Sequence, residues 1–261
     1  LKGTMSFAPS QWFQSPRFLF SAALLSGLAC ATDAAAQKDV IYWIDGTVSR
    51  DVRIKEFSLV TIKYTERGSK DRAGDQVVRI ELAEFNEEFG GVLEARDPDG
   101  MVTMARDFIK RKPLLAQVAF LESARLYLEQ NNAGTAFETL KELIAADEKG
   151  GLVAETFRTK FDYYIGNGQF GDARKVAKKF TDEALNNGWP EGFGHEGTFM
   201  EILAMDVSGN GKPKELQTRY SDLLRTVQGA YPKIAHQAEV RLAASLQASG
   251  DKDGARRLYD G

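Results

Sequence analysis

Residues 235–260, AHQAEVRLAASLQASGDKDGARRLYD, contain two helical patterns that are separated by a short polar turn. Leu242 and Leu246 recur at helical spacing before the turn, and Ala255 opens the second pattern after it. Gly250 suits the left-handed conformation in which many helices end. The stretch therefore predicts two antiparallel helices. Because one such pair cannot bury its apolar faces alone, it also predicts further pairs beside it.

The same form recurs along most of the preceding chain. A small or apolar residue opens the second helix of four pairs at a period of roughly 40 residues. These residues are Ala136, Ala173, Leu216 and Ala255. A fifth pair is expected upstream, within residues 86–112, where the turn DPDG separates two apolar patterns. Stacked helix pairs of this kind form an α-solenoid with a continuous core.

The helix pairs resemble the tetratricopeptide repeat family, and the resemblance covers residues 84–261. It is carried by small and aromatic residues at the family's packing positions. They are Leu242, Ala243, Leu246, Gly250, Asp251, Ala255 and Tyr259 in the last pair, and Tyr164, Gly168 and Ala173 in an earlier one. The period is longer than the roughly 34 residues usual in that family, which would make the superhelix irregular.

This resemblance implies a binding surface. In tetratricopeptide proteins the first helix of each pair lines the concave face, where polar side chains hold a peptide or a helix. Carried over by register, the candidate protein-binding residues are Arg125, Glu129, Arg158, Asp162, Glu201 and Gln247. Their mixed charges favour a protein or peptide ligand over a lipid or a nucleic acid.

The last helix pair is a second candidate surface. The given sequence stops at Gly261, and no polar capping helix follows the last pair. End repeats of solenoids expose an apolar face unless a polar helix covers them. We therefore expect Leu258 and Tyr259 to contact a partner or a second copy of the chain, with Arg256 and Arg257 as a charged rim.

A different period precedes the helices. Between residues 39 and 82 the apolar residues alternate in four short segments, and Asp45-Gly46 between the first two is a hairpin signal. The sequence ERGS (66–69) is expected to be a turn after the third segment. The pattern predicts a small antiparallel β barrel or sheet over residues 37–83, and it resembles the SH3-like or Sm-like barrels. With the helices that follow, the predicted fold class is α+β.

The first 36 residues are predicted to be a secretory signal peptide. An apolar run of 14 residues, 18–31, follows Arg17 and is too short to span a bilayer. Cleavage is expected after Ala36, which leaves an exported mature chain, periplasmic or in the cell envelope, without cysteine or a transmembrane segment. Acylation of Cys30 at a lipoprotein-type site, which would tether the chain to a membrane, is the alternative.

Composition and motifs point to no particular chemistry. The formal net charge is −3, with 43% hydrophobic and 27% charged residues, which argues against nucleic acid as a partner. DVSGNGKPKELQ (206–217) resembles a calcium loop, but Gln217 stands where a bidentate glutamate is needed, so we interpret it as a helix–helix turn. His195 lies in a glycine-rich stretch, 191–197, which we interpret as a linker, and His236 lies on a helix. No cofactor, metal or catalytic site is predicted.

These observations predict an exported, non-catalytic scaffold or adaptor that binds protein partners, or further copies of itself, through its helical repeats. Two alternatives stay open. One is a structural subunit of an envelope assembly, joined through sheet edges or the last repeat. The other is an enzyme or solute-binding module whose site lies between the sheet and the helices.

Overall fold

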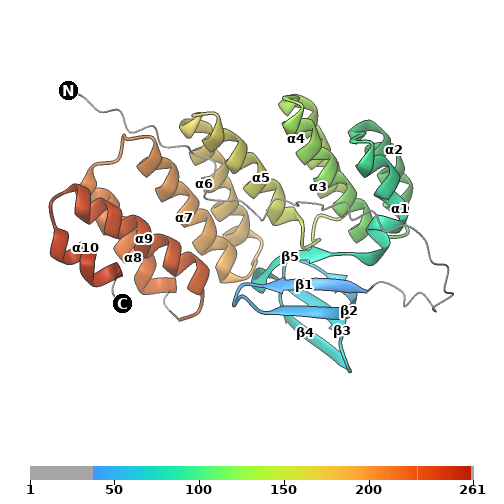
Figure 1. Ribbon diagram of the computed structural model, residues 1–261, viewed down its shortest axis with the longest axis horizontal. Helices are drawn as coiled ribbons and strands as arrows, with labels where there is room; N and C mark the ends of the chain where they lie inside the picture. The colour runs from blue at the N-terminus through green and yellow to red at the C-terminus, as the bar shows by residue number, and fades with distance from the viewer. Residues whose placement is uncertain (1–37, 228, 260–261) are drawn as a thin grey trace, which may run out of the picture.

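The computed structural model describes residues 38–227 and 229–259, and the predicted signal peptide with Cys30 lies outside them. Within these residues an open, five-stranded antiparallel sheet precedes ten α-helices, which confirms the α+β class (Figure 1). None of the helices in this part of the chain is both long and apolar enough to cross a bilayer.

The sheet has the strand order β4-β3-β2-β1-β5, so β4 and β5 are its edges and it is open rather than closed as a barrel. Its strands are β1 (Asp39–Trp43), β2 (Val48–Phe57), β3 (Thr61–Thr65), β4 (Ser69–Ala73) and β5 (Val77–Glu81). The sequence pattern predicts four of them and misses β4. This strand has the sequence SKDRA, and most of it is exposed, so it lacks the alternating apolar residues by which a half-buried strand is recognised.

β1 and β2 form the expected hairpin. Gly46 has a φ of +82°, which suits a tight hairpin turn, and the Asp45 carboxylate accepts hydrogen bonds from the backbone N–H (2.9 Å) and hydroxyl (2.6 Å) of Thr47. β2 then continues beyond the hairpin. Its first part pairs with β1 and its later part pairs with β3. The long strand thus leads the chain from the hairpin to Phe57, where the sheet meets the helices.

The helices form five consecutive pairs, as the sequence predicts. The pairs are α1 (Ala83–Glu94) with α2 (Pro98–Phe108), α3 (Pro113–Glu129) with α4 (Ala133–Ala146), α5 (Val153–Gly166) with α6 (Phe170–Asn186), α7 (Glu191–Val207) with α8 (Pro213–Val227), and α9 (Pro232–Ala248) with α10 (Lys252–Tyr259). Ala136, Ala173 and Ala255, which open second helices, are all buried. Their small side chains let neighbouring helices approach closely, so the pairs stack into a helical array.

The glycine-rich stretch 191–197 is the start of α7, so its interpretation as a linker is wrong. Gly192 packs against Asp75 and Tyr231, and Gly197 packs against Thr181. A Cβ atom at either glycine would collide with these neighbours. Glycine therefore serves close packing between elements here, and it does not mark a loop.

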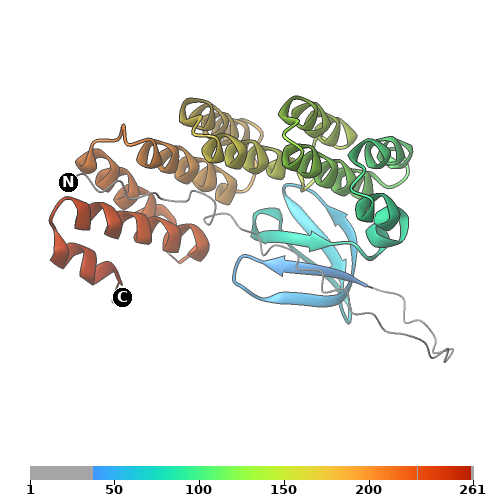
Figure 2. The same ribbon diagram turned by 45° about the horizontal axis from the view of Figure 1, so that its top comes forward.

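The sheet packs against the helices at the loop between α4 and α5. The backbone N–H of Gly151 donates to the Phe57 carbonyl (3.0 Å), and that of Leu59 donates to the Lys149 carbonyl (2.9 Å), around an isolated antiparallel bridge. The ring of Phe57 lies against the α-carbon of Gly151. Figure 2 shows the result, with the sheet beneath the layer of helices.

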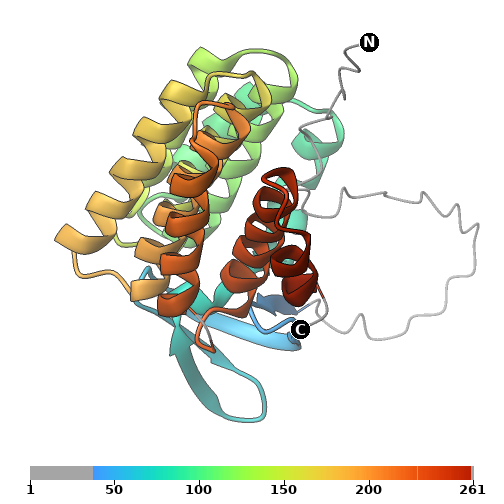
Figure 3. The same ribbon diagram turned by 90° about the vertical axis from the view of Figure 1, so that its left-hand side faces the viewer.

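Two aspartates hold the sheet at further points. Asp75, in the short 3-10 helix η2 (Gly74–Gln76), accepts a hydrogen bond from Gly192 N at the start of α7 (3.2 Å). Asp39 accepts hydrogen bonds from Ala83 N at the start of α1 (3.0 Å) and from Ile54 N in β2 (2.8 Å). The buried residues of sheet and helices form one continuous core, and the end-on view in Figure 3 shows the sheet below the helices.

Replacing Gly151 by alanine should lower the free energy of unfolding by about 1–3 kcal/mol, because the added Cβ would overlap the Phe57 ring and force it to shift. Gly134→Ala in α4 is the control, since a Cβ there meets nothing within 4 Å, and it should leave stability unchanged or slightly higher. Urea unfolding followed by circular dichroism measures both variants. Equal stabilities would contradict the packing described for this loop.

Candidate functional site

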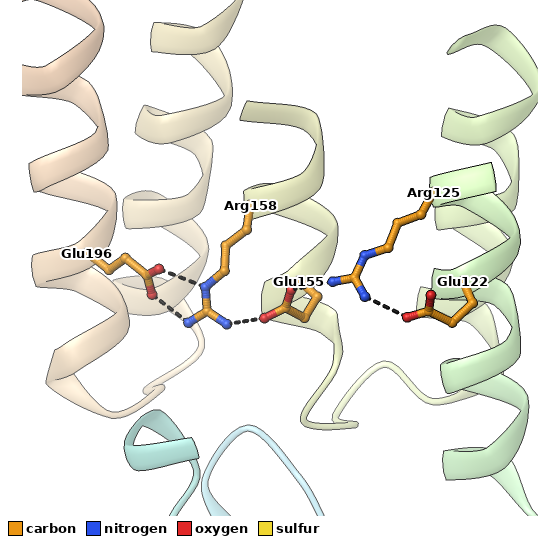
Figure 4. A network of polar contacts seen from close by, with 5 residues as sticks. All are labelled: Glu122, Arg125, Glu155, Arg158 and Glu196. Carbon is orange, nitrogen blue, oxygen red and sulfur yellow. Dashed lines mark hydrogen bonds and ion pairs between the residues drawn. The ribbon is translucent and has the colours of Figure 1, made fainter. Parts of the chain in front are cut away.

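Charged side chains from three successive first helices gather on one side of the array. They are Glu122 and Arg125 of α3, Glu155, Arg158 and Asp162 of α5, and Glu196 of α7. Residues three or four positions apart share one face of a helix, which explains how each helix presents its members together. We call these residues the first-helix cluster, and Figure 4 shows it without Asp162.

Arg158 is the centre of the cluster. Its Nε and Nη2 donate to Glu196 Oε1 (2.7 Å) and Oε2 (2.6 Å), and its Nη1 donates to Glu155 Oε1 (2.5 Å). The two parallel bonds to Glu196 are the geometry in which a planar guanidinium matches a carboxylate best. Arg158 therefore joins α5 to α7 through a directional contact.

Arg125 makes a similar connection one helix pair earlier. Its Nη1 donates to Glu122 (2.6 Å) within α3, and its Nη2 donates to Glu155 Oε2 (3.3 Å) across to α5. Glu155 is thus shared between an arginine of its own helix and one of α3. The consequence is an unbroken row of alternating charges that crosses three helices.

The cluster is accessible to solvent and yet surrounded by protein. The side chain of Arg125 is 41% exposed and that of Arg158 is 20% exposed. Burial opposes the charge of both guanidiniums, but neighbouring glutamates outweigh it and raise the pKa of each. Burial also acts to raise the pKa of Glu155, but Arg158 and Arg125 together hold it below its usual range. The neighbouring protein atoms thus partly desolvate these charges, although both arginine side chains remain in contact with solvent.

Asp162 differs from the other members of the cluster. Burial raises its pKa to about 8, and repulsion from the Glu155 and Glu196 carboxylates adds to the effect of burial. No hydrogen bond or ion pair joins its side chain to another residue of the described ranges. Asp162 is therefore largely protonated at neutral pH, although it lies one turn from Arg158.

The structure brings together three of the predicted binding residues, Arg125, Arg158 and Asp162. Two others are engaged elsewhere. Glu129 forms an ion pair with Arg96, which follows α1. Glu201 lies 3.4 Å from Arg174 of α6 and 3.6 Å from Arg219 of α8, so it contacts second helices and not the cluster.

The remaining predicted binding residues lie on the last helix pair. Gln247 is exposed near the end of α9. On α10, Leu258 is half-buried against the core, while Tyr259 is 56% exposed. Of the two apolar side chains predicted to contact a partner, Tyr259 is thus the accessible one.

Three members of the cluster, Glu122, Glu155 and Glu196, were missed by sequence reasoning. A signal for two of them exists, because the spacing Glu-x-x-Arg occurs at 122–125 in α3 and again at 155–158 in α5. Glu196 has no such local signal. Its role depends on the distance between α5 and α7, which the sequence pattern does not contain.

The calcium-like stretch 206–217 contains the turn between α7 and α8, as interpreted from the sequence. The Asp206 carboxylate accepts a hydrogen bond from the Tyr220 hydroxyl (3.1 Å) and lies 3.6 Å from Arg241 Nη1. It thus helps to pack α7 against α8 and α9. Nowhere in residues 38–227 and 229–259 do three His, Cys, Asp or Glu side chains gather as metal ligands would. The His195 ring packs 5.4 Å from that of Tyr231.

Replacing Asp162 by asparagine should stabilise the protein at alkaline pH. The pKa of about 8 in the folded state exceeds the ordinary value of 3.8, so between these values the folded state holds a proton that the unfolded state has lost. The wild-type free energy of unfolding therefore falls as pH rises through this window, and the variant lacks that loss. Its melting temperature should exceed that of the wild type by more at about pH 8.5 than at about pH 4.5.

The control for this measurement is Asp182→Asn, the same substitution at an exposed position on α6. It should change the melting temperature equally at both pH values. If Asp162→Asn behaved like this control, Asp162 could not be a desolvated carboxyl in the cluster.

Searches of protein-family models, curated proteins and solved structures found no match to this chain.

Proposed function

We propose that the protein is an exported, non-catalytic scaffold whose tetratricopeptide-like helical array binds a partner protein. The binding surface in this proposal is the side of the array that carries the first-helix cluster. One observation carries it: α3, α5 and α7 present a connected row of charges that are desolvated and still accessible. Partly desolvated ion pairs contribute little net stability compared with apolar side chains of similar size, so their presence in a connected row favours a binding role.

The dimensions of the cluster suit an extended peptide segment. Packed helices lie about 8–10 Å apart, so a row over three helices spans roughly 16–20 Å. An extended chain advances about 3.3 Å per residue, and five or six residues would cover that distance. A segment of this length could meet the side chains of each helix in turn, which is how helical-repeat proteins use their extended surfaces.

The pairing of the charges supports binding rather than catalysis as the role of the cluster. Arg158 and Arg125 are held by carboxylates in fixed geometry. Fixed hydrogen-bonding groups of both signs provide orientation and specificity for a polar ligand. The sheet would contribute by holding the α4–α5 loop and the start of α7, and therefore the helices from which Glu155 and Glu196 project.

Export is part of the proposal and rests on the N-terminal sequence. Arg17, the apolar run of residues 18–31 and the small residues before Gln37 have the form of a secretory signal peptide. The scaffold would then act in the periplasm or the cell envelope, where its partner would also be found.

Site-specific photo-crosslinking tests the binding surface. A photoreactive residue at Glu129, one turn after Arg125 on α3, keeps the cluster intact and should label one discrete protein in the native envelope. Leu185 on α6, which is 71% exposed, is the control position and should not label that protein. Arg158→Lys should reduce labelling from position 129, because lysine cannot make the bidentate contact to Glu196. Identical labelling from both positions would exclude this surface as the binding site.

If the protein is exported, expression with its own leader in a bacterial host should give a processed chain of defined N-terminus. The protein should be recovered outside the cytoplasm with an N-terminus near Gln37, because cleavage is expected after Ala36. Intact-mass analysis of the exported fraction measures this. A chain that retains residues 18–36, or one acylated at Cys30, would contradict cleavage at that position.

A further inference from the structure

The first-helix cluster has more carboxylates than cations. Its acidic members are Glu122, Glu155, Asp162 and Glu196, and its basic members are Arg125 and Arg158. One further cation has a field that reaches Glu155, namely Lys233 at the start of α9. With Asp162 ionised, the four carboxylates exceed these three cations by one negative charge, whereas with Asp162 protonated the charges balance.

Both arginines already form hydrogen bonds with glutamates of the cluster. Three guanidinium nitrogens of Arg158 donate to Glu196 and Glu155, and two of Arg125 donate to Glu122 and Glu155. An anionic ligand would have to displace these contacts and leave a desolvated glutamate without its partner. Such an exchange is unfavourable, so the cluster does not suit an acidic ligand.

Asp162 is the member of the cluster that remains available to pair with a ligand. It lies one turn beyond Arg158 on the same face of α5, is partly exposed, and has no hydrogen bond or ion pair with another described residue. Its charge is disfavoured by burial and by Glu155 and Glu196 more than it is favoured by Arg158 and Arg125. A cation placed beside Asp162 would favour its ionised form and lower its pKa.

We infer that Asp162 anchors a lysine or arginine side chain of the bound segment, and hence that the partner presents a basic peptide to this face. The inference rests on the proposed function and narrows it. A cationic side chain is complementary to this site, because it can pair with the Asp162 carboxylate and balance the one negative charge that appears when Asp162 ionises, without displacing either arginine. The rest of the segment can remain polar, because the paired members of the cluster present both donors and acceptors.

Binding of a cation has a measurable consequence for protons. The Asp162 carboxyl is mostly protonated at neutral pH and would ionise when it pairs with lysine or arginine. Complex formation near pH 7 should therefore release up to about one proton per site. Calorimetric titration in two buffers of different ionisation enthalpy measures this release, and the release should disappear in Asp162→Asn.

The affinity test uses an N-acetylated octapeptide with lysines at alternate positions and a matched peptide with glutamates. The lysine peptide should bind the wild-type protein, and Asp162→Asn should weaken binding by about tenfold or more. Asp182→Asn is the same substitution on α6 and should keep nearly the wild-type affinity. Asp162→Glu retains the carboxylate and should retain most of the binding. Circular dichroism establishes that each variant is folded.

Three results would overturn the inference: no binding of the lysine peptide to the wild type, equal affinities of Asp162→Asn and Asp182→Asn, or preference for the glutamate peptide. If Asp162→Asn fails to fold, two measurements on the wild type test the inference instead. The wild type should prefer the lysine peptide to the glutamate peptide, and the lysine peptide should compete with crosslinking from position 129. Crosslinking that persists unchanged in excess lysine peptide would reject a basic segment and leave the proposed scaffold in place. Absence of any partner at position 129 would reject the scaffold itself.

Discussion

The packing of the end of β2 against the α4–α5 loop is the contact on which the rest of the structure depends. The Gly151 N–H donates to the Phe57 carbonyl and the Leu59 N–H donates to the carbonyl of Lys149, two and four residues before α5 begins, respectively. A side chain at Gly151 would displace the Phe57 ring, so the loop can approach the sheet only with glycine there. Because α5 starts immediately afterwards, this contact positions the helix from which Glu155, Arg158 and Asp162 project. The sheet is thus a support for the helix at the centre of the cluster.

The cluster in turn shows how a helical array can hold partly desolvated charges. Burial acts to raise the pKa of Glu155, but Arg158 and Arg125 hold that pKa below its usual range. Arg158 remains charged because Glu196 and Glu155 offset the cost of its burial. Asp162 receives no comparable contact, and its pKa rises to about 8. The same surroundings therefore give ionised and protonated carboxyls within two turns of one helix, and the difference is whether a guanidinium lies in contact.

The elements that periodicity reveals were predictable, and those without periodicity were not. Leu242 and Leu246 recur at helical spacing, and Ala255 opens the next helix, because one side of each helix faces the core. The same reasoning locates all five pairs. β4 was missed because an exposed edge strand has no buried face to produce alternation. The start of α7 was misread because Gly192 and Gly197 are required by neighbours distant in sequence, Asp75 and Thr181, and local propensity treats glycine as a loop signal.

Spacing along the chain was sufficient to predict the fold class, the helix pairs, the hairpin at Asp45-Gly46 and the helix face on which Arg125, Arg158 and Asp162 lie. Tertiary structure alone decided which partners those side chains have. Glu129 and Glu201 were predicted to lie on the same face as the cluster, but Glu129 pairs with Arg96 and Glu201 with Arg174 and Arg219. Glu196 joins the cluster from α7 through its ion pair with Arg158. The physical reason is that an ion pair depends on the distance between helices, and that distance follows from the packing of the core and the sheet.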